Sequence, residues 1–261
     1  MEDRRLLISD VDGTLLGDDV ALEAFAAWCD RQRDWLRLVY NSGRFVESVL
    51  DSVATSGLPA PDAVIGGVGT QIHCLRTGTR LSEWPATGDG WQPERIRALL
   101  RKYDALELQP AELLSEHKIS YFAHSASESM LHEACSRLAE AGCDVEIIYS
   151  SSRDLDVLPR GVNKGTAAAH LASRWGYAPE QVYVSGDTAN DLAMFAQGFC
   201  GIVVGNAHDE LRQLAGPDVF LATKSHAAGV QQGVEHWRAR QAATSLGGTC
   251  PIDGVAVRRR L

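Results

Sequence analysis

Short apolar runs alternate with segments of helical spacing at both ends of this chain, and the alternation stops in the middle. The apolar runs lie at residues 5–9, 36–40 and 63–65 before the break, and at 181–185, 200–204 and 219–221 after it. The helical segments between and after them lie at residues 20–34, 45–56, 164–175, 192–197, 209–214 and 227–240. Strands that alternate with helices form βαβ units, in which helices cover both faces of a parallel sheet. The sequence therefore predicts an α/β core with a Rossmann-like parallel sheet, assembled from two separate parts of the chain.

The middle of the chain has a different pattern. Helical spacing occurs at residues 93–103 and 129–141, and strand-like alternation at 118–124, 145–149 and 155–158. This is the pattern of an α+β module inserted into the α/β core. We predict a discontinuous catalytic core at residues 1–82 and 159–240, an inserted α+β cap domain at 83–158, and a loose C-terminal tail at 241–261.

Charge and hydropathy exclude two classes of function. The chain has 261 residues and a formal net charge of -9 at pH 7, which disfavours binding to nucleic acid and to anionic membranes. A run of three arginines at 258–260 is interpreted as part of a solvated tail. The sequence has no apolar run of about 18 residues and no long apolar leader after its first five residues, Met-Glu-Asp-Arg-Arg. We expect a cytoplasmic protein that binds neither membranes nor nucleic acid.

Two carboxylates follow the first apolar run, in Asp10-Val11-Asp12-Gly13-Thr14. In an extended chain, residues i and i+2 point to the same side. Ligands of open α/β sheets bind beyond the carboxyl ends of the strands. We favour a functional site here, with a solvated Asp-Gly turn as the alternative.

Two further clusters suit an anion. Asn41-Ser42-Gly43-Arg44 follows the second run and precedes a helix, where a hydroxyl and backbone N–H groups can face a phosphate. An ordinary helix N-cap is the alternative. Lys164 stands at the start of a later helix, with a surface lysine as the alternative.

The last cluster, Gly186-Asp187-Thr188-Ala189-Asn190-Asp191, directly follows another apolar run. Carboxylates at Asp187 and Asp191 suit Mg²⁺, which prefers a few carboxylates together with water and phosphate oxygens. Helix capping by Asp and Asn is the alternative. Because three clusters follow strands of one predicted sheet and Lys164 begins a helix, all four are expected to converge at one edge of that sheet.

These clusters resemble the four motifs of the haloacid dehalogenase superfamily: D-x-D-x-T, then S/T, then K, then G-D-x-x-x-D. The resemblance covers residues 1–82 and about 159–237, and the long insertion looks like a type-two cap. Within the superfamily, the chain most resembles the sucrose-phosphate phosphatase family, which includes mannosylfructose-phosphate phosphatase. Stretches outside the motifs share this likeness: 40–44, 117–121, 154–159, 201–207 and 227–230.

The resemblance implies a role for each residue. Asp10 is the expected nucleophile, and Asp12 the general acid and base. A Mg²⁺ cofactor is expected on the Asp10 carboxylate, the Asp12 carbonyl and Asp187, with Asp191 supporting the metal site or Lys164. The residues expected to bind the phosphoryl group or the substrate around it are Ser42, Gly43, Arg44, Lys164 and Asn190.

In the cap, His117, Lys118 and Ser120 are candidates for sugar contacts, with a solvated strand edge as the alternative. The expected function is Mg²⁺-dependent hydrolysis of a sugar phosphate through an aspartyl-phosphate. Sucrose-6-phosphate or a closely related disaccharide phosphate is the expected substrate; mannosylfructose-phosphate and glucosylglycerol-phosphate are alternatives. A sugar phosphomutase and a non-catalytic sugar-phosphate binding module are the other classes considered. Association with the glycosyltransferase that forms the substrate is a further expectation.

Overall fold

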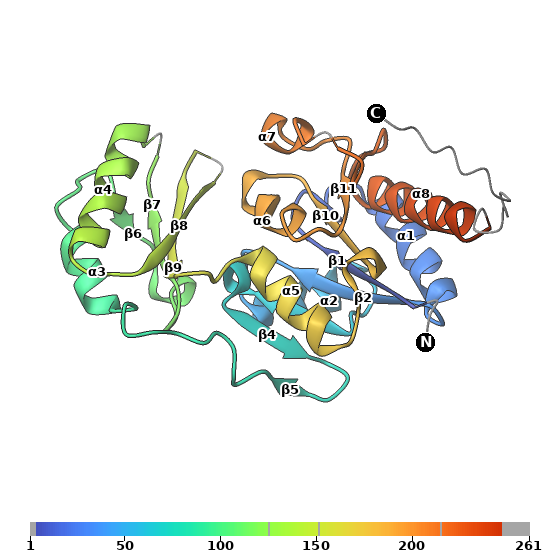
Figure 1. Ribbon diagram of the computed structural model, residues 1–261, viewed down its shortest axis with the longest axis horizontal. Coiled ribbons are helices and arrows are strands. Elements are labelled where there is room, and N and C mark those ends of the chain that lie inside the picture. Colours follow the sequence, from blue (N-terminus) through green and yellow to red (C-terminus); the bar gives the residue numbers. More distant parts are fainter. Residues whose placement is uncertain (1–3, 125, 151, 215, 247–261) are drawn as a thin grey trace, which may run out of the picture.

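The computed structural model describes residues 4–124, 126–150, 152–214 and 216–246. Within them, the chain forms a large lobe around one sheet and a smaller lobe around a second sheet (Figure 1). The large sheet has the strand order β12-β11-β10-β1-β2-β3-β4-β5. Its strands are β1 (Arg5–Ser9), β2 (Leu36–Asn41), β3 (Ala63–Gly66), β4 (Gln71–Cys74), β5 (Thr79–Arg80), β10 (Val182–Gly186), β11 (Cys200–Val203) and β12 (Val219–Leu221).

The first and last thirds of the chain share this sheet, as the alternating pattern predicts. β1 lies between β2 and β10 and pairs with both in parallel register, so Leu6 is opposite Val182 although they lie 176 residues apart in sequence. The helices of this lobe are α1 (Asp19–Gln32), α2 (Val46–Thr55), α5 (Lys164–Arg174), α6 (Leu192–Phe195), α7 (Asp209–Arg212) and α8 (His226–Leu246). The predicted α/β class with a parallel-sheet core is confirmed.

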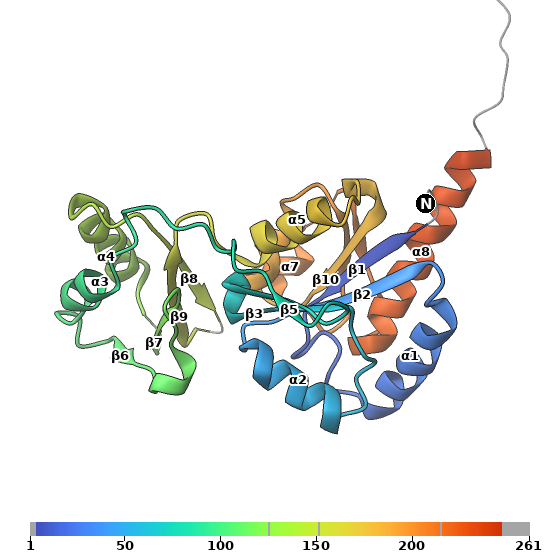
Figure 2. The ribbon, with the colours of Figure 1, turned by 90° about the horizontal axis from the view of Figure 1, so that it is seen from below.

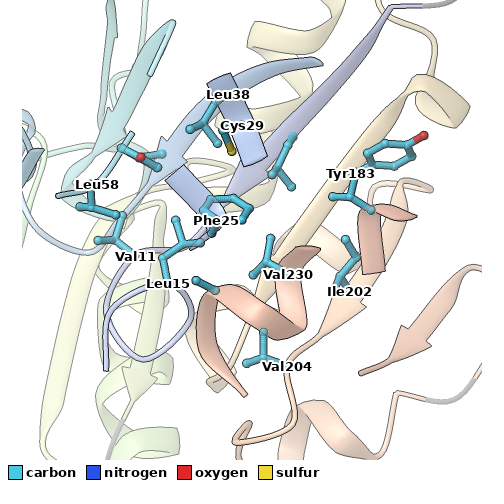
Figure 3. Packing of buried hydrophobic residues seen from close by; sticks show 14 of the residues in the cluster. Val11, Leu15, Phe25, Cys29, Leu38, Leu58, Tyr183, Ile202, Val204 and Val230 are labelled. Atoms are coloured by element: carbon cyan, nitrogen blue, oxygen red, sulfur yellow. The ribbon is translucent and has the colours of Figure 1, made fainter. Parts of the chain in front are cut away.

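Successive residues of the central strands pack on opposite faces of the sheet. Leu7 of β1 belongs to the core beneath α1, α2 and α8, whereas Leu6 and Ile8 belong to the core beneath α5. Figure 2 shows these helices on the two sides of the sheet, and Figure 3 shows the first core, in which Phe25 of α1 and Val230 of α8 pack near the strands. Burial on both faces explains why these strands read as continuous apolar runs.

The inserted segment forms the smaller lobe. Its strands are β6 (Glu107–Leu108), β7 (Ile119–Phe122), β8 (Val145–Ser150) and β9 (Asp154–Pro159), which pair antiparallel in the order β6-β7-β9-β8. Helices α3 (Pro93–Leu100) and α4 (Glu128–Glu140) pack on one face and enclose a separate apolar core (Figure 1). This lobe is called the cap below.

Two features differ from the sequence prediction. β4 and β5 add an antiparallel hairpin to the edge of the sheet, where only short extended pieces were expected. Helix α8 continues to Leu246, past the expected end at residue 240. Gln241 is held there, because its side chain accepts from Tyr183 Oη at 2.9 Å and donates to the Glu180 carbonyl at 2.7 Å. The remainder of the predicted tail, 247–261, lies outside the described residues.

No helix within the described residues combines the length and apolar character needed to cross a bilayer.

The packing of α8 on β11 depends on Gly233. A Cβ at this position would lie 2.3 Å from Ile202 Cγ2 in the buried core. In an exposed helix, Gly→Ala stabilises by about 1 kcal/mol. We expect Gly233→Ala to destabilise instead, by about 1 to 2 kcal/mol, because overpacking outweighs helix propensity. Denaturant unfolding measures this, with exposed Glu235→Ala on the same helix as the control; a more stable Gly233→Ala variant would contradict the packing.

Candidate active site

The catalytic candidates gather at the edge where the parallel strands end. Asp10 follows β1, Ser42 follows β2 and Asp187 follows β10, and these three strands are neighbours in the sheet. All three side chains are buried. The sequence prediction that the motifs converge there agrees with this placement, and the solvated-turn alternative for Asp10 does not.

Lys164 lies at the centre of this group. Its ammonium donates to Asp10 Oδ1 and to Asp191 Oδ1, each at 2.7 Å, and to Asn190 Oδ1 at 3.2 Å. The side chain is fully buried, so the surface-lysine alternative is wrong. Burial by itself lowers the pKa of Lys164, but the carboxylates of Asp10 and Asp191 outweigh it and raise that pKa above its ordinary value. The lysine is therefore held as a cation.

Asp191 is bonded on both carboxylate oxygens. Oδ1 accepts from Lys164, and Oδ2 accepts from the backbone N–H groups of Asp187 and Thr188 at 3.0 and 3.3 Å. Burial raises its pKa to about 7, opposed by Lys164. The helix-capping alternative considered for this cluster is therefore partly right, because Asp191 accepts from backbone N–H groups as well as from Lys164. Its geometry suits a residue that positions Lys164 and the β10 loop.

Three carboxylates lie close enough to share a metal ion. Ligand oxygens of Asp10, Asp187 and Asp191 lie within 4.8 Å of one another. Among the described residues, no hydrogen-bond donor reaches the buried Oδ2 of Asp10. Burial, and then the charge of Asp10, raise the pKa of Asp187 to about 6. Three buried acids against one lysine, with one oxygen lacking a partner, fit a divalent cation.

Gly13 allows Asp187 to approach the first motif. Its φ is +81°, and a Cβ there would lie 2.3 Å from Asp187 Oδ2. Thr14 Oγ1 donates to Asp187 Oδ1 at 2.9 Å, so the first motif orients the last one.

Sequence reasoning missed the residues that hold the Gly13 carbonyl. Asn206 Nδ2 donates to this oxygen at 2.7 Å, and His226 Nδ1 lies 3.0 Å from it. Asn206 Oδ1 also accepts from the His226 backbone N–H at 2.8 Å. Asn206 follows β11 and lies in the stretch 201–207 that resembles the family, but it was not predicted as a site residue. Its position after a strand of the same sheet was the signal that would have found it.

The second motif brings a guanidinium to the site. Ser42 is buried, and its Oγ accepts from the Arg44 N–H at 3.1 Å. Ser42 does not cap α2, whose N-cap residue is Phe45, so the N-cap alternative is wrong. Arg44 Nε lies 2.8 Å from Asp12 Oδ2. Partial burial raises the pKa of Asp12 and Arg44 opposes the increase. A Cβ added at Gly43 would meet only Val68 Cγ2, at 4.0 Å, so there is open space beside this residue.

The cap candidates form their own buried cluster. Lys118 Nζ lies 2.9 Å from Asp156 Oδ1 and 2.5 Å from Ser120 Oγ, and Ser120 donates to Asp156 at 2.6 Å. Burial of Lys118 and Ser120 contradicts the solvated-edge alternative. Sequence reasoning did not single out Asp156. Lys118 Nζ also lies 5.5 Å from the Phe45 ring centroid, so this cluster borders the core beside Arg44.

His117 faces a different cavity from the Lys118 cluster. It is half-buried and lines a space of about 350 Å³ between the cap and the β4–β5 region, together with Gln71, Arg80 and Trp84.

A parallel sheet with an inserted cap, a buried Asp10–Lys164 pair and an acidic cluster at the strand ends define a phosphatase of the haloacid dehalogenase superfamily. Comparison with known proteins agrees. The model of the family described as sucrose-6F-phosphate phosphohydrolase matches residues 3–238. The chain belongs to this family, and it is a phosphoric monoester hydrolase acting on a sugar phosphate.

Individual relatives resemble the chain over most of its length. Mannosylfructose-phosphate phosphatase of Agrobacterium fabrum is 38% identical over 243 residues, which cover 91% of this chain and 98% of the relative. Sucrose-phosphatase 1 of Nicotiana tabacum is 30% identical, over 90% of this chain and 59% of its own length. The crystal structure of the sucrose-phosphatase from Synechocystis, in complex with sucrose and phosphate, superposes with a TM-score of 0.84 at 30% identity, covering 90% of this chain and 98% of that one.

Removal of the Lys164 charge tests the ion-pair centre. Lys164→Met leaves Asp10 and Asp191 buried without their cation, and we expect a loss of about 3 to 5 kcal/mol in unfolding free energy at pH 8. At pH 5 the loss should be smaller. Burial raises the pKa of Asp191 to about 7 even though Lys164 opposes the increase, so this pKa is higher still when Lys164 is removed. The buried acid is then protonated at pH 5, and the associated stability is lost as the pH rises toward that pKa.

Denaturant unfolding in EDTA at both pH values measures the effect. Lys224→Met, at an exposed lysine, is the matched control and should change stability little. If Lys164→Met lost the same unfolding free energy at pH 5 and at pH 8, Lys164 would not be the cation that balances these buried carboxylates.

Proposed function

We propose that this chain is a Mg²⁺-dependent phosphatase that hydrolyses a disaccharide phosphate through an aspartyl-phosphate on Asp10. The observation that carries the proposal is the state of the Asp10 carboxylate. Lys164 binds Oδ1, whereas the buried Oδ2 has no hydrogen-bond donor among the described residues. Such a carboxylate is held in one orientation and keeps an oxygen available for reaction.

In the first step, Asp10 attacks phosphorus and the bond between phosphorus and the sugar oxygen breaks. Asp12 donates its proton to the departing oxygen. Its raised pKa supports this role, because it favours the protonated acid. In the second step, Asp12 takes a proton from water, which attacks the phosphorus and releases Asp10 and inorganic phosphate.

Positive and polar groups around Asp10 stabilise the phosphoryl charge. Lys164 lies beside the nucleophile, and Ser42, with the Gly43 N–H, lies at the end of the neighbouring strand. Asn190 is held by Lys164 and by Thr188 Oγ1, at 3.2 and 3.0 Å, where its amide can bond the phosphate. Mg²⁺ on Asp10, the Asp12 carbonyl and Asp187 would neutralise charge that otherwise repels an anionic nucleophile.

The substrate proposal rests on the cap and on the relatives. Lys118, Ser120 and Asp156 offer a cation, a hydroxyl and a carboxylate beside Phe45, and a disaccharide carries hydroxyls that suit all three. The relatives are named for mannosylfructose-phosphate and for sucrose phosphate. The greater identity over nearly the whole length of the first favours mannosylfructose-phosphate over sucrose-6-phosphate. Association with a glycosyltransferase stays a prediction.

Phosphate release from a panel of sugar phosphates tests the reaction. The panel holds sucrose-6-phosphate, mannosylfructose-phosphate, glucosylglycerol-phosphate and common hexose phosphates, each with Mg²⁺ and with EDTA. We expect release that requires Mg²⁺ and that falls at least about 10³-fold in Asp10→Asn, because the nucleophile is lost.

Asp209→Asn, at an exposed carboxylate in α7, is the matched control and should keep full activity. If phosphate were released as fast in EDTA as in Mg²⁺, the proposed metal requirement would be wrong. If Asp10→Asn released phosphate at the wild-type rate, Asp10 would not be the nucleophile. If a hexose phosphate were preferred, the proposal of a disaccharide phosphate substrate would be wrong.

A second kinetic experiment tests the cap contact. We expect Lys118→Ala to raise KM about tenfold and to leave kcat within about threefold, because it removes sugar binding and leaves the phosphoryl site intact. Lys102→Ala, at an exposed cap lysine, is the control. Unchanged KM and kcat in a folded Lys118→Ala variant would show that Lys118 does not contact the sugar.

A further inference from the structure

A second cavity lies on the side of the core sheet where the parallel strands begin, opposite the side where they end and the catalytic candidates lie. Its volume is about 490 Å³, within the range of small-molecule sites. The residues that matter for its chemistry are Arg4, Arg37, Arg76, Arg174, Trp175 and Tyr177.

The position of these residues follows from the fold. Arg4 directly precedes β1 and Arg37 is the second residue of β2. Arg76 follows β4, which runs antiparallel to β3 and therefore ends at this edge. Arg174 is the last residue of α5, the helix that begins with Lys164. Lys164 and Arg174, the two ends of the eleven-residue helix α5, are ten residue steps apart, which places this cavity about 15 Å from the catalytic lysine along the helix axis.

The cavity is positively charged in a chain whose net charge is -9. Four arginines line it, and its lining contains no Asp or Glu. Carboxylates beside it partly balance two of the arginines: Asp62 lies 3.8 Å from Arg37, and Glu83 lies 2.7 Å from Arg174. The structure shows no carboxylate within ion-pair distance of Arg4 or Arg76 among the residues it describes. Within that described part of the chain, the guanidinium groups of Arg4 and Arg76 therefore have no carboxylate to balance them.

Two half-buried aromatic side chains complete the lining. The Arg37 guanidinium lies 5.8 Å from the centroid of the Trp175 ring, and Tyr177 lies in the same wall. Guanidinium groups bind phosphate oxygens in bidentate geometry. Aromatic rings beside them favour a ligand that also has a flat ring. A disaccharide phosphate has neither a diphosphate nor such a ring, so the proposed substrate does not account for this cavity.

We propose that this cavity is a binding site for a small molecule that carries a diphosphate and an aromatic ring, the chemistry of a nucleoside diphosphate. The diphosphate contacts Arg4 and Arg76, and the ring packs against Trp175 and Tyr177. The site is separate from the catalytic edge, and its occupancy does not depend on Asp10 or on Mg²⁺.

Calorimetric titration of the full chain with ADP in EDTA tests the proposal. We expect saturable binding of one ADP per chain, weakened at least about tenfold in the double variant Arg4→Ala/Arg76→Ala, because two charge-assisted contacts are lost. Arg95→Ala/Arg101→Ala, which removes two exposed arginines from the cap, is the matched control and should bind as the wild type does. Both double variants should keep wild-type sugar-phosphate hydrolysis, which separates this site from the catalytic one.

Three outcomes would overturn the proposal. If Arg4→Ala/Arg76→Ala bound ADP with wild-type affinity, or if ADP binding did not saturate, this cavity would not be the proposed binding site. If inorganic pyrophosphate bound as tightly as ADP, the proposed packing of a ligand ring against Trp175 and Tyr177 would be wrong. Arg76→Glu is a second variant. Arg76 is exposed, so we expect this charge reversal to weaken ADP binding relative to the wild type and to leave the fold intact.

Discussion

The buried ammonium of Lys164 is the interaction on which the catalytic edge depends. Two buried carboxylates, Asp10 and Asp191, meet it at 2.7 Å from strand ends that lie far apart in sequence. Charges are costly to bury unless they are paired and hydrogen-bonded. A lysine with three bonds to oxygen satisfies this condition for itself and for both acids. The strands β1 and β10 and the helix α5 are therefore positioned relative to one another by electrostatics as well as by apolar packing.

The cap is connected to this centre through the start of α5. Asn163 caps the helix by accepting from the Thr166 N–H, and its side-chain amide donates to Glu146 of β8 at 2.6 Å. The carbonyl of Lys164 accepts from Asn41 at the end of β2. One short segment thus binds the cap strand on one side and the second catalytic motif on the other. Asn163 and Lys164 therefore connect the cap strand β8 to the large sheet.

The two edges of the sheet carry opposite charges. Carboxylates dominate the edge where the strands end, and arginines dominate the cavity where the strands begin. The carboxylates at the acidic edge are of the kind that suits a divalent cation. The basic edge needs no metal to bind an anion. Parallel strands produce this separation, because every strand begins at one edge and ends at the other.

The sequence by itself determined the α/β core, the interruption by a cap and the four motifs, because these depend on local periodicity and on residues that directly follow strands. It also indicated that Asp10, Ser42, Lys164 and Asp187 would meet, since parallel strands end at a common edge. Only the tertiary structure decided the partners. Ser120 meets Asp156 through the antiparallel register of β7 and β9, and Asn206 and His226 reach Gly13 from distant elements. Such pairs depend on strand register and helix packing between segments far apart in the chain, and no local pattern encodes these.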